Sequence, residues 1–102
     1  MHTIWHESRG KDGELRFHTN RKAYIDETQY NYYLFIKFDD ETRGGNAWQW
    51  YVNRWVWKEG GRVEDTESID KGACSTLAAA EIACEWVTMN HMGRWDIYRG
   101  GK

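Results

Sequence analysis

The sequence predicts an α+β fold, in which an antiparallel sheet of four to five strands carries one long helix on one face. Residues 30–38 and 47–58 are rich in the aromatic and β-branched side chains that suit a pleated surface. Polar segments containing glycine separate the predicted strands. After residue 74 the pattern becomes rich in alanine with helical spacing. The 102 residues fit a single domain, 1–102.

The first part of the chain predicts a hairpin followed by an ambiguous stretch. His2 to Ser8 is expected to form an opening strand, and Asp12-Gly13 is a strong hairpin-turn signal. Glu14 to Thr19 would return as the second strand. The polar residues 20–29 are expected to form a loop or one helical turn.

Three strands are then expected in the middle of the chain. Tyr30 to Phe38 is the clearest, and after a polar turn Ala47 to Lys58 runs back beside it. Gly60-Gly61 would make a second tight turn. Arg62 to Ile69 would be a third, more polar strand near an edge of the sheet, where charged side chains discourage aggregation.

The alanine-rich segment predicts the helix. Ser75 or Thr76 can cap its start, and Gly93 can end it in a left-handed conformation. Residues 94–102 would close the chain as a short strand or an extended tail. The apolar stripe of this helix is formed by Leu77, Ala80, Cys84 and Val87 and is widened by Ala83 and Trp86.

Residues 47–58 place indole rings on both sides of one strand, since successive side chains alternate between the faces of a sheet. One of the two alternating sets of side chains is more uniformly apolar, and we assign it to the side that faces the helix. It consists of Trp48, Trp50, Val52 and Val56, interrupted by Arg54. The other set is Tyr51, Trp55 and Trp57.

The register of the third strand stays open between two alternatives. A two-residue loop at Gly60-Gly61 would pair Arg54 with Glu67 and Val52 with Ile69. A three-residue loop would change the parity and turn the other side of the third strand inward.

Two interpretations of the second aromatic set are retained. In one, tryptophans on both faces build a small core, with Trp5 and Phe17 folding over the back. In the other, the set is a binding surface, because Trp, Tyr and Arg concentrate interface energy. The candidate partner-binding residues are Tyr33, Tyr51, Arg54, Trp55 and Trp57, helped by the acidic Glu64, Asp65 and Glu67.

No motif for catalysis, for a metal or for a cofactor is found, so we expect none of the three. His2 and His6 could chelate a metal, but their terminal position favours a solvated pair. Cys84 and His91 are seven residues apart on the predicted helix, too far for a direct hydrogen bond. Whether Cys74 and Cys84 pair stays open.

The net charge and the hydropathy of the chain limit the classes of partner that it can bind. The net charge of −2 argues against a large basic footprint for duplex DNA. No apolar stretch approaches membrane-spanning length and the first residues lack signal-peptide character, so we expect a cytoplasmic protein without a membrane partner.

Two resemblances bear on function. The segments YYLFIKF, WQWYVNRWVW, GGRVEDTESID and STLAAAEIACEWV, about two thirds of the chain, resemble the AP2/integrase-type DNA-binding domain. That family reads the major groove with arginines and tryptophans of its sheet. Here only Arg54 and Arg62 are well placed on the central hairpin and the third strand is acidic, a departure that argues against DNA binding.

The short length, the tryptophan bias and the aromatic hairpin that leads into STLAAAEIACEW resemble small proteins of phages and mobile elements, which include anti-CRISPR inhibitors. Such inhibitors cover a surface of a host complex without catalysis. The leading hypothesis is therefore a non-catalytic protein-binding domain that inhibits a host defence nuclease complex, with a host protein or protein–nucleic-acid complex as its partner. Direct nucleic-acid binding through the aromatic sheet is the alternative, and a homodimer that buries the second aromatic set is a third possibility.

Overall fold

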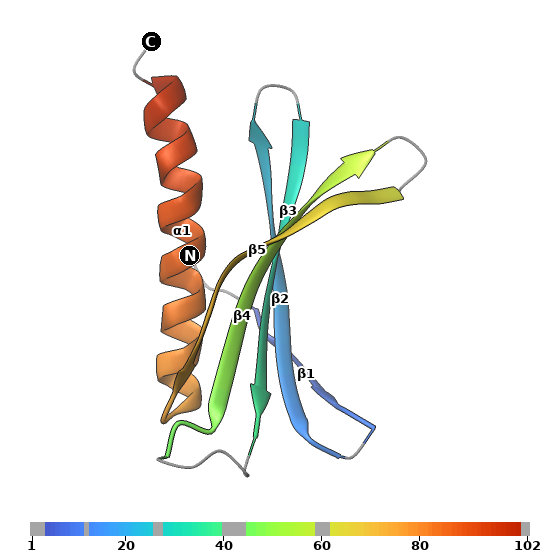
Figure 1. The fold of residues 1–102 in the computed structure, drawn as a ribbon, viewed down its shortest axis with the longest axis vertical. Coiled ribbons are helices and arrows are strands. Elements are labelled where there is room, and N and C mark those ends of the chain that lie inside the picture. The colour runs from blue at the N-terminus through green and yellow to red at the C-terminus, as the bar shows by residue number, and fades with distance from the viewer. Residues whose placement is uncertain (1–3, 12, 26–27, 40–44, 59–61, 101–102) are drawn as a thin grey trace.

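A computed structural model describes residues 4–11, 13–25, 28–39, 45–58 and 62–100, with the backbone alone for 25, 57, 58, 62–65 and 93–100. The chain forms a five-stranded antiparallel sheet in the order β1-β2-β3-β4-β5, with one helix on one face, which confirms the predicted α+β class (Figure 1). The elements are β1 His6–Arg9, β2 Leu15–Ile25, β3 Thr28–Phe38, β4 Trp48–Lys58, β5 Arg62–Cys74 and α1 Leu77–Gly100.

The prediction of a loop or helical turn over residues 20–29 is wrong, because β2 and β3 continue through this stretch as one long antiparallel pair. Ala23 pairs with Tyr30, and both side chains pack against the core. On the opposite face the Asn31 amide donates a hydrogen bond to Asn20 over 3.1 Å. This strand pair is mostly polar in composition. It is stabilised by core contacts on one face and by polar cross-strand contacts on the other. Residues 26–27 lie outside the described residues.

The turn between β1 and β2 needs glycine at one position. The Gly13 N–H donates to the Gly10 carbonyl, and the Gly10 N–H donates to the Glu14 carbonyl. Gly13 has a φ of 82°, a left-handed conformation that a residue without Cβ adopts at little cost. Its predicted neighbour in the turn, Asp12, and the predicted strand residues His2 and Thr3 lie outside the described residues.

The helix begins as predicted and ends later than predicted. The Thr76 hydroxyl accepts a 3.1 Å hydrogen bond from the Ala79 N–H, which identifies Thr76 as the capping residue. The helix passes through Gly93 and continues to Gly100, so both the predicted stop and the predicted strand or tail are wrong. A single glycine inside a helix costs only about 1 kcal/mol relative to alanine, and no proline follows to break the helix.

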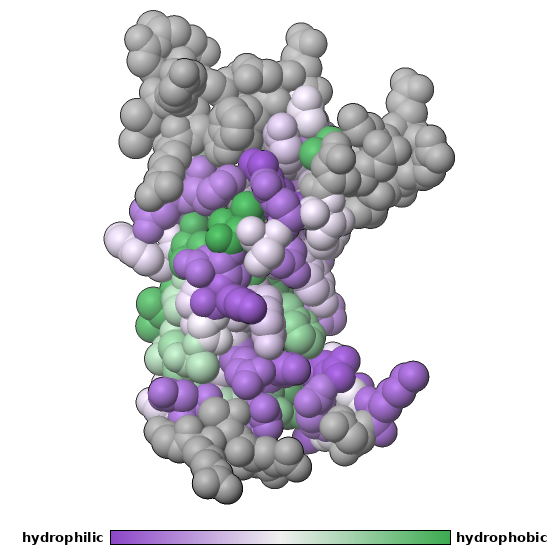
Figure 2. All heavy atoms as spheres, viewed as in Figure 1, coloured by the Kyte–Doolittle hydropathy of each residue, from purple (hydrophilic) through white to green (hydrophobic). Residues whose placement is uncertain are grey.

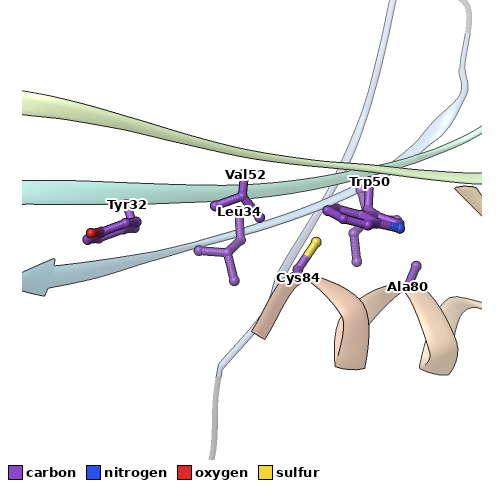
Figure 3. Close-up of a cluster of buried hydrophobic side chains, with 7 residues drawn as sticks. Tyr32, Leu34, Trp50, Val52, Ala80 and Cys84 are labelled. Carbon is purple, nitrogen blue, oxygen red and sulfur yellow. The ribbon is translucent and has the colours of Figure 1, made fainter. Parts of the chain in front are cut away.

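The core lies between α1 and the helix-facing side of β3 and β4. Figure 3 shows Leu34, Trp50 and Val52 pointing from the sheet toward Cys84 and Ala80 of the helix. The predicted assignment of Trp50 and Val52 to the helix side is therefore confirmed. The buried hydrophobic residues of this cluster are Tyr32, Leu34, Ile36, Trp50, Val52, Ala80 and Cys84.

The register between β4 and β5 changes twice along the pair. Lys58 pairs with Arg62, as a three-residue connection requires. Two irregularities then add residues to β5, so that Arg54 lies opposite Glu67 and Val52 lies opposite Asp70. Neither predicted register describes the whole pair, because each assumes a ladder without bulges. Bulges increase the local twist of a strand, and the β4–β5 tip bends away from the other strands in Figure 1. Gly60-Gly61 lies outside the described residues.

Gly72 makes room for the largest core side chain. It lies opposite Trp50 in the register, and a Cβ built on Gly72 would be 2.7 Å from two carbon atoms of the indole ring. Trp50 is only 8% exposed, so its ring has little space into which it can move. The packing of the indole against the β5 backbone therefore requires glycine at this position.

We predict that Gly72→Ala lowers the free energy of unfolding by about 1–3 kcal/mol, the usual cost of overpacking a core. The measurement is urea denaturation followed by circular dichroism. In a Trp50→Leu background, which removes the indole, the same substitution at Gly72 should cost clearly less. An unchanged or increased stability of Gly72→Ala would show that the indole does not confine this position.

Candidate functional site: an aromatic sheet face

The face of the sheet that points away from α1 carries a continuous group of aromatic rings. Residues directly opposite one another in the register share a face: His6 pairs with His18, His18 with Phe35, and Phe35 with Tyr51. Tyr33 and Trp55 alternate onto the same side. We call this group the aromatic face: His6, His18, Tyr33, Phe35, Tyr51 and Trp55.

The rings of the aromatic face contact one another across four strands. Tyr33 is central, with its ring centroid 5.9 Å from that of His18, 6.1 Å from that of Phe35 and 5.6 Å from that of Trp55. The His6 and His18 rings are 5.4 Å apart, and the Phe35 and Tyr51 rings are 6.0 Å apart. These distances are typical of aromatic pairs. Neighbouring rings therefore hold one another in place and form an ordered surface.

The aromatic face is only partly covered by its own neighbours. Of its six residues only His6 is exposed, and the other five are half-buried by lateral contacts within the sheet. Burial raises the pKa of Tyr33, and the nearby Arg16 partly opposes this shift. The Nε1 atom of Trp55 is buried and has no hydrogen-bond partner among the described residues. The rings thus form a flat, semi-exposed layer.

No described element covers the aromatic face, since α1 lies on the other side of the sheet (Figure 1). Trp5 and Phe17, which were expected to fold over the back in the core interpretation, pack against the core cluster on the helix side. That part of the core interpretation is wrong. Phe17 lies opposite Ile36 in the register, which directs it to the helix side.

Cations lie among these rings. The Arg16 guanidinium is 5.9 Å from the Phe35 ring centroid, and the Lys37 ammonium is 5.9 Å from the Tyr51 ring centroid. By register Lys22 and Lys71 are on the same side, opposite Asn31 and Tyr51. Among the described side chains of the strands no carboxylate shares this face. Glu14 and Asp39, just outside the strands, contact Arg16 and Gln49 respectively, so the Arg16 cation is paired. Lys22, Lys37 and Lys71 make the described part of this face cationic, although the chain carries a net charge of −2.

The structure divides the predicted partner-binding residues between the two sides of the sheet. Tyr33, Tyr51 and Trp55 come together on the aromatic face, whereas Arg54 and Glu67 form an ion pair on the helix side. The side chains of Trp57, Glu64 and Asp65 lie outside the described residues. Glu67 is therefore not a neighbour of the aromatic rings that it was expected to assist.

Arg54 belongs to a structural cluster on the helix side. Its guanidinium lies 4.5 Å from the Tyr30 ring centroid and 6.0 Å from that of Tyr32. The Tyr32 hydroxyl is 2.7 Å from Nδ1 of His91 on α1. Burial raises the pKa of Tyr32, and a hydrogen bond from Arg54 opposes the shift. The cluster joins β3, β4, β5 and α1. The role of Arg54 is therefore to hold these elements together.

Sequence reasoning missed His6, His18 and Phe35 as members of the aromatic face. Phe35 lies two positions after Tyr33 in one predicted strand, so the two side chains point to the same face. This spacing alone would have identified Phe35 as a member of the aromatic face. The two histidines join the site only through the β1–β2 and β2–β3 registers. Within the described residues, no group of three or more His, Cys, Asp or Glu side chains is placed to hold a metal ion.

The two cysteines are free. Cys84 is completely buried in the core, and burial raises the pKa of its thiol to about 12. The reactive form of cysteine is the thiolate, so the Cys84 side chain is a packed, protonated thiol at neutral pH. This environment does not suit a catalytic nucleophile, which must be accessible and ionised.

Comparison of the chain with known proteins finds no match to a family model, to a curated protein or to a solved structure. Within the described residues no helix combines the length and the apolar character needed to cross a membrane. We therefore infer function from the surface chemistry of this chain.

We predict that thiol reagents at about pH 8 do not modify Cys84 in the folded protein, because its thiolate is not populated and the side chain is inaccessible. Mass spectrometry after brief treatment with iodoacetamide should locate any adduct on the half-buried Cys74. In urea both residues should react. Cys84→Ser is the matched control and should leave the native labelling unchanged; rapid native modification of Cys84 would contradict its burial.

Proposed function

We propose that this chain is a non-catalytic protein-binding domain that docks on its partner through the aromatic face. The observation that carries the proposal is a connected layer of aromatic rings on a sheet face that no described element covers. Aromatic side chains dominate the energetics of interfaces, and exposed clusters of them on monomers mark contact sites. Strand pairing holds the rings before binding, so less conformational entropy is lost on association.

The more specific proposal is an inhibitor of the anti-CRISPR type, made by a phage or mobile element and acting in the host cytoplasm. It would cover a surface of a host defence nuclease complex, and this function requires no cofactor. If acidic residues of the third strand made the contact, the partner surface would be basic. Because Arg16 and Lys37 lie among the rings and Glu67 does not, we expect the contacted surface to carry acidic and apolar groups.

Single-stranded nucleic acid is the second candidate partner, and one specific observation favours it. Arg16 and Lys37 lie beside the Phe35 and Tyr51 rings, and Lys22 and Lys71 lie on the same face. Proteins that bind single strands combine cations that follow the backbone with rings on which bases stack. The helix-side location of the Arg54–Glu67 pair leaves this combination undisturbed.

We predict that Trp55→Ala and Tyr51→Ala each weaken partner binding by about 2 kcal/mol or more, as interface anchors do. The partner is first recovered from host lysate and identified by mass spectrometry, and binding is then measured by calorimetry with the purified partner. Ile4→Ala is the control, because Ile4 is 71% exposed and lies outside the aromatic face. Unchanged affinity in both face variants would refute the proposal, and loss of the fold in Trp55→Ala would assign this ring to the core.

For the nucleic-acid alternative, we predict binding of a fluorescent single-stranded oligonucleotide, measured by anisotropy. The affinity should fall on the order of ten-fold between about 50 and 200 mM salt, as a few phosphate contacts imply. Lys37→Gln should weaken binding and reduce the salt dependence. Lys11→Gln, in the β1–β2 turn, serves as the control. The absence of binding at the lower salt concentration would remove this alternative.

A further inference from the structure

The outer side of α1 carries an unusual row of exposed hydrophobic side chains. Ile82, Trp86 and Met89 are 66%, 65% and 63% exposed, and their spacing places them on one side of the helix. The prediction that Trp86 widens the core-facing stripe is therefore wrong. We call these three residues the helix stripe. The most exposed face of a helix normally carries charged or polar side chains. Figure 2 shows hydrophobic side chains reaching the surface over α1.

Within residues 77–92 no charged side chain is fully exposed. The charged residues Glu81 and Glu85 are half-buried, and Glu85 lies 3.4 Å from Arg21 of β2. The exposed residues of this part of the helix are Ala78, Ala79, Ile82, Trp86, Met89 and Asn90. A helix that is apolar toward the core and uncharged toward solvent is typical of a helix buried on both sides.

A hollow lies beside the helix stripe, between α1 and β5. It has a volume of about 310 Å³, and Trp86 belongs both to the stripe and to the wall of the hollow. The other lining residues are Ile69, Asp70, Val87, Asn90 and His91. The same surface thus presents a protruding row of side chains and a depression next to it.

We propose that the helix stripe is the interface of a homodimer, in which the stripe of one copy packs against the stripe and hollow of the other. A two-fold interface uses the same patch on both copies, so the patch must complement itself. Protruding side chains beside a hollow meet this condition. The uncharged stripe meets it too, since contact between two stripes brings no exposed like charges together, whereas a different partner is commonly selected by opposite charge. Asp70, the exposed carboxylate of the hollow wall, would meet the uncharged stripe of the other copy.

The area available fits a modest dimer. Three side chains that each expose roughly 100 Å² supply roughly 600 Å² from the two copies, given that large apolar side chains bury 150–250 Å² when fully covered. Ala78, Ala79, Asn90 and the walls of the hollow add to this, which brings the total near the ~1,000 Å² expected of a specific interface. We therefore expect a dissociation constant on the order of micromolar.

The test measures molar mass by analytical ultracentrifugation between about 0.1 and 100 µM, a range that brackets a micromolar dissociation constant. The wild type should pass from the 12.2 kDa of one chain to twice that mass. Trp86→Glu and Ile82→Glu should raise the dissociation constant at least about thirty-fold, as loss of an interface anchor does. Both residues are exposed, so the helical circular dichroism of each variant should stay unchanged.

Tyr24→Glu is the matched control, because it places the same charge at a similarly exposed position, on the face of the sheet that α1 does not cover. It should dimerise as the wild type does. A wild type that remains at 12.2 kDa throughout the range would overturn the proposal. The same holds for a dimer whose dissociation constant does not respond to either Trp86→Glu or Ile82→Glu. Should one variant fail to fold, the other decides the result.

Discussion

One helix can shelter only one face of a sheet, and side chains along a strand must alternate between the two faces. In β4 this constraint directs Trp50 and Val52 into the core and leaves Tyr51 and Trp55 on the other side. No rotamer can bring the second pair to the helix, because the backbone of β4 lies between them and α1. The aromatic face is a direct consequence of tryptophan and tyrosine at both parities of this strand.

The same alternation separates charge as well as hydrophobicity. Arg54 and Glu67 lie opposite each other on the helix side, where they pair beside the rings of Tyr30 and Tyr32. Arg16 and Lys37 remain on the other side among the aromatic rings. A chain with a net charge of −2 therefore presents several cationic side chains on its aromatic face. The net charge of the sequence argues against a large nucleic-acid footprint, but it carries no information about the sign of one face.

The sequence predicts elements well where hydrophobic alternation is strong. Residues 30–38 and 47–58 carry many apolar side chains at a period of two, and the start of the helix follows from Thr76 and the alanines after it. A period of two cannot be recognised in residues 20–29, because Ala23 is the only described side chain of this stretch that packs against the core. The stretch becomes a strand pair because β3 is already held by β4, a tertiary effect that no local pattern expresses.

Two further differences have local causes that composition does not reveal. Gly93 was read as a stop, but a glycine ends a helix only when the next residues leave the helical path, and residues 94–100 do not. The β4–β5 register fails to follow from loop length, because the bulges add residues to β5 after the turn. The members of the aromatic face on β3 and β4 could be predicted from the alternation of side chains along each strand. The positions of His6 and His18 depend on strand pairings that only the folded sheet defines.

The two surfaces of this molecule are mutually compatible because they lie on opposite sides of the sheet. The helix stripe belongs to the outer side of α1, and the aromatic face belongs to the side of the sheet that α1 does not cover (Figure 1). Two copies joined through their helices would leave both aromatic faces open and directed away from each other. Such a dimer would bind one target at each aromatic face. It would gain avidity only where both targets belong to one assembly that reaches around the dimer, because effective concentration depends on geometry. Dimerisation would therefore make the proposed binder bivalent without adding a residue to the aromatic face.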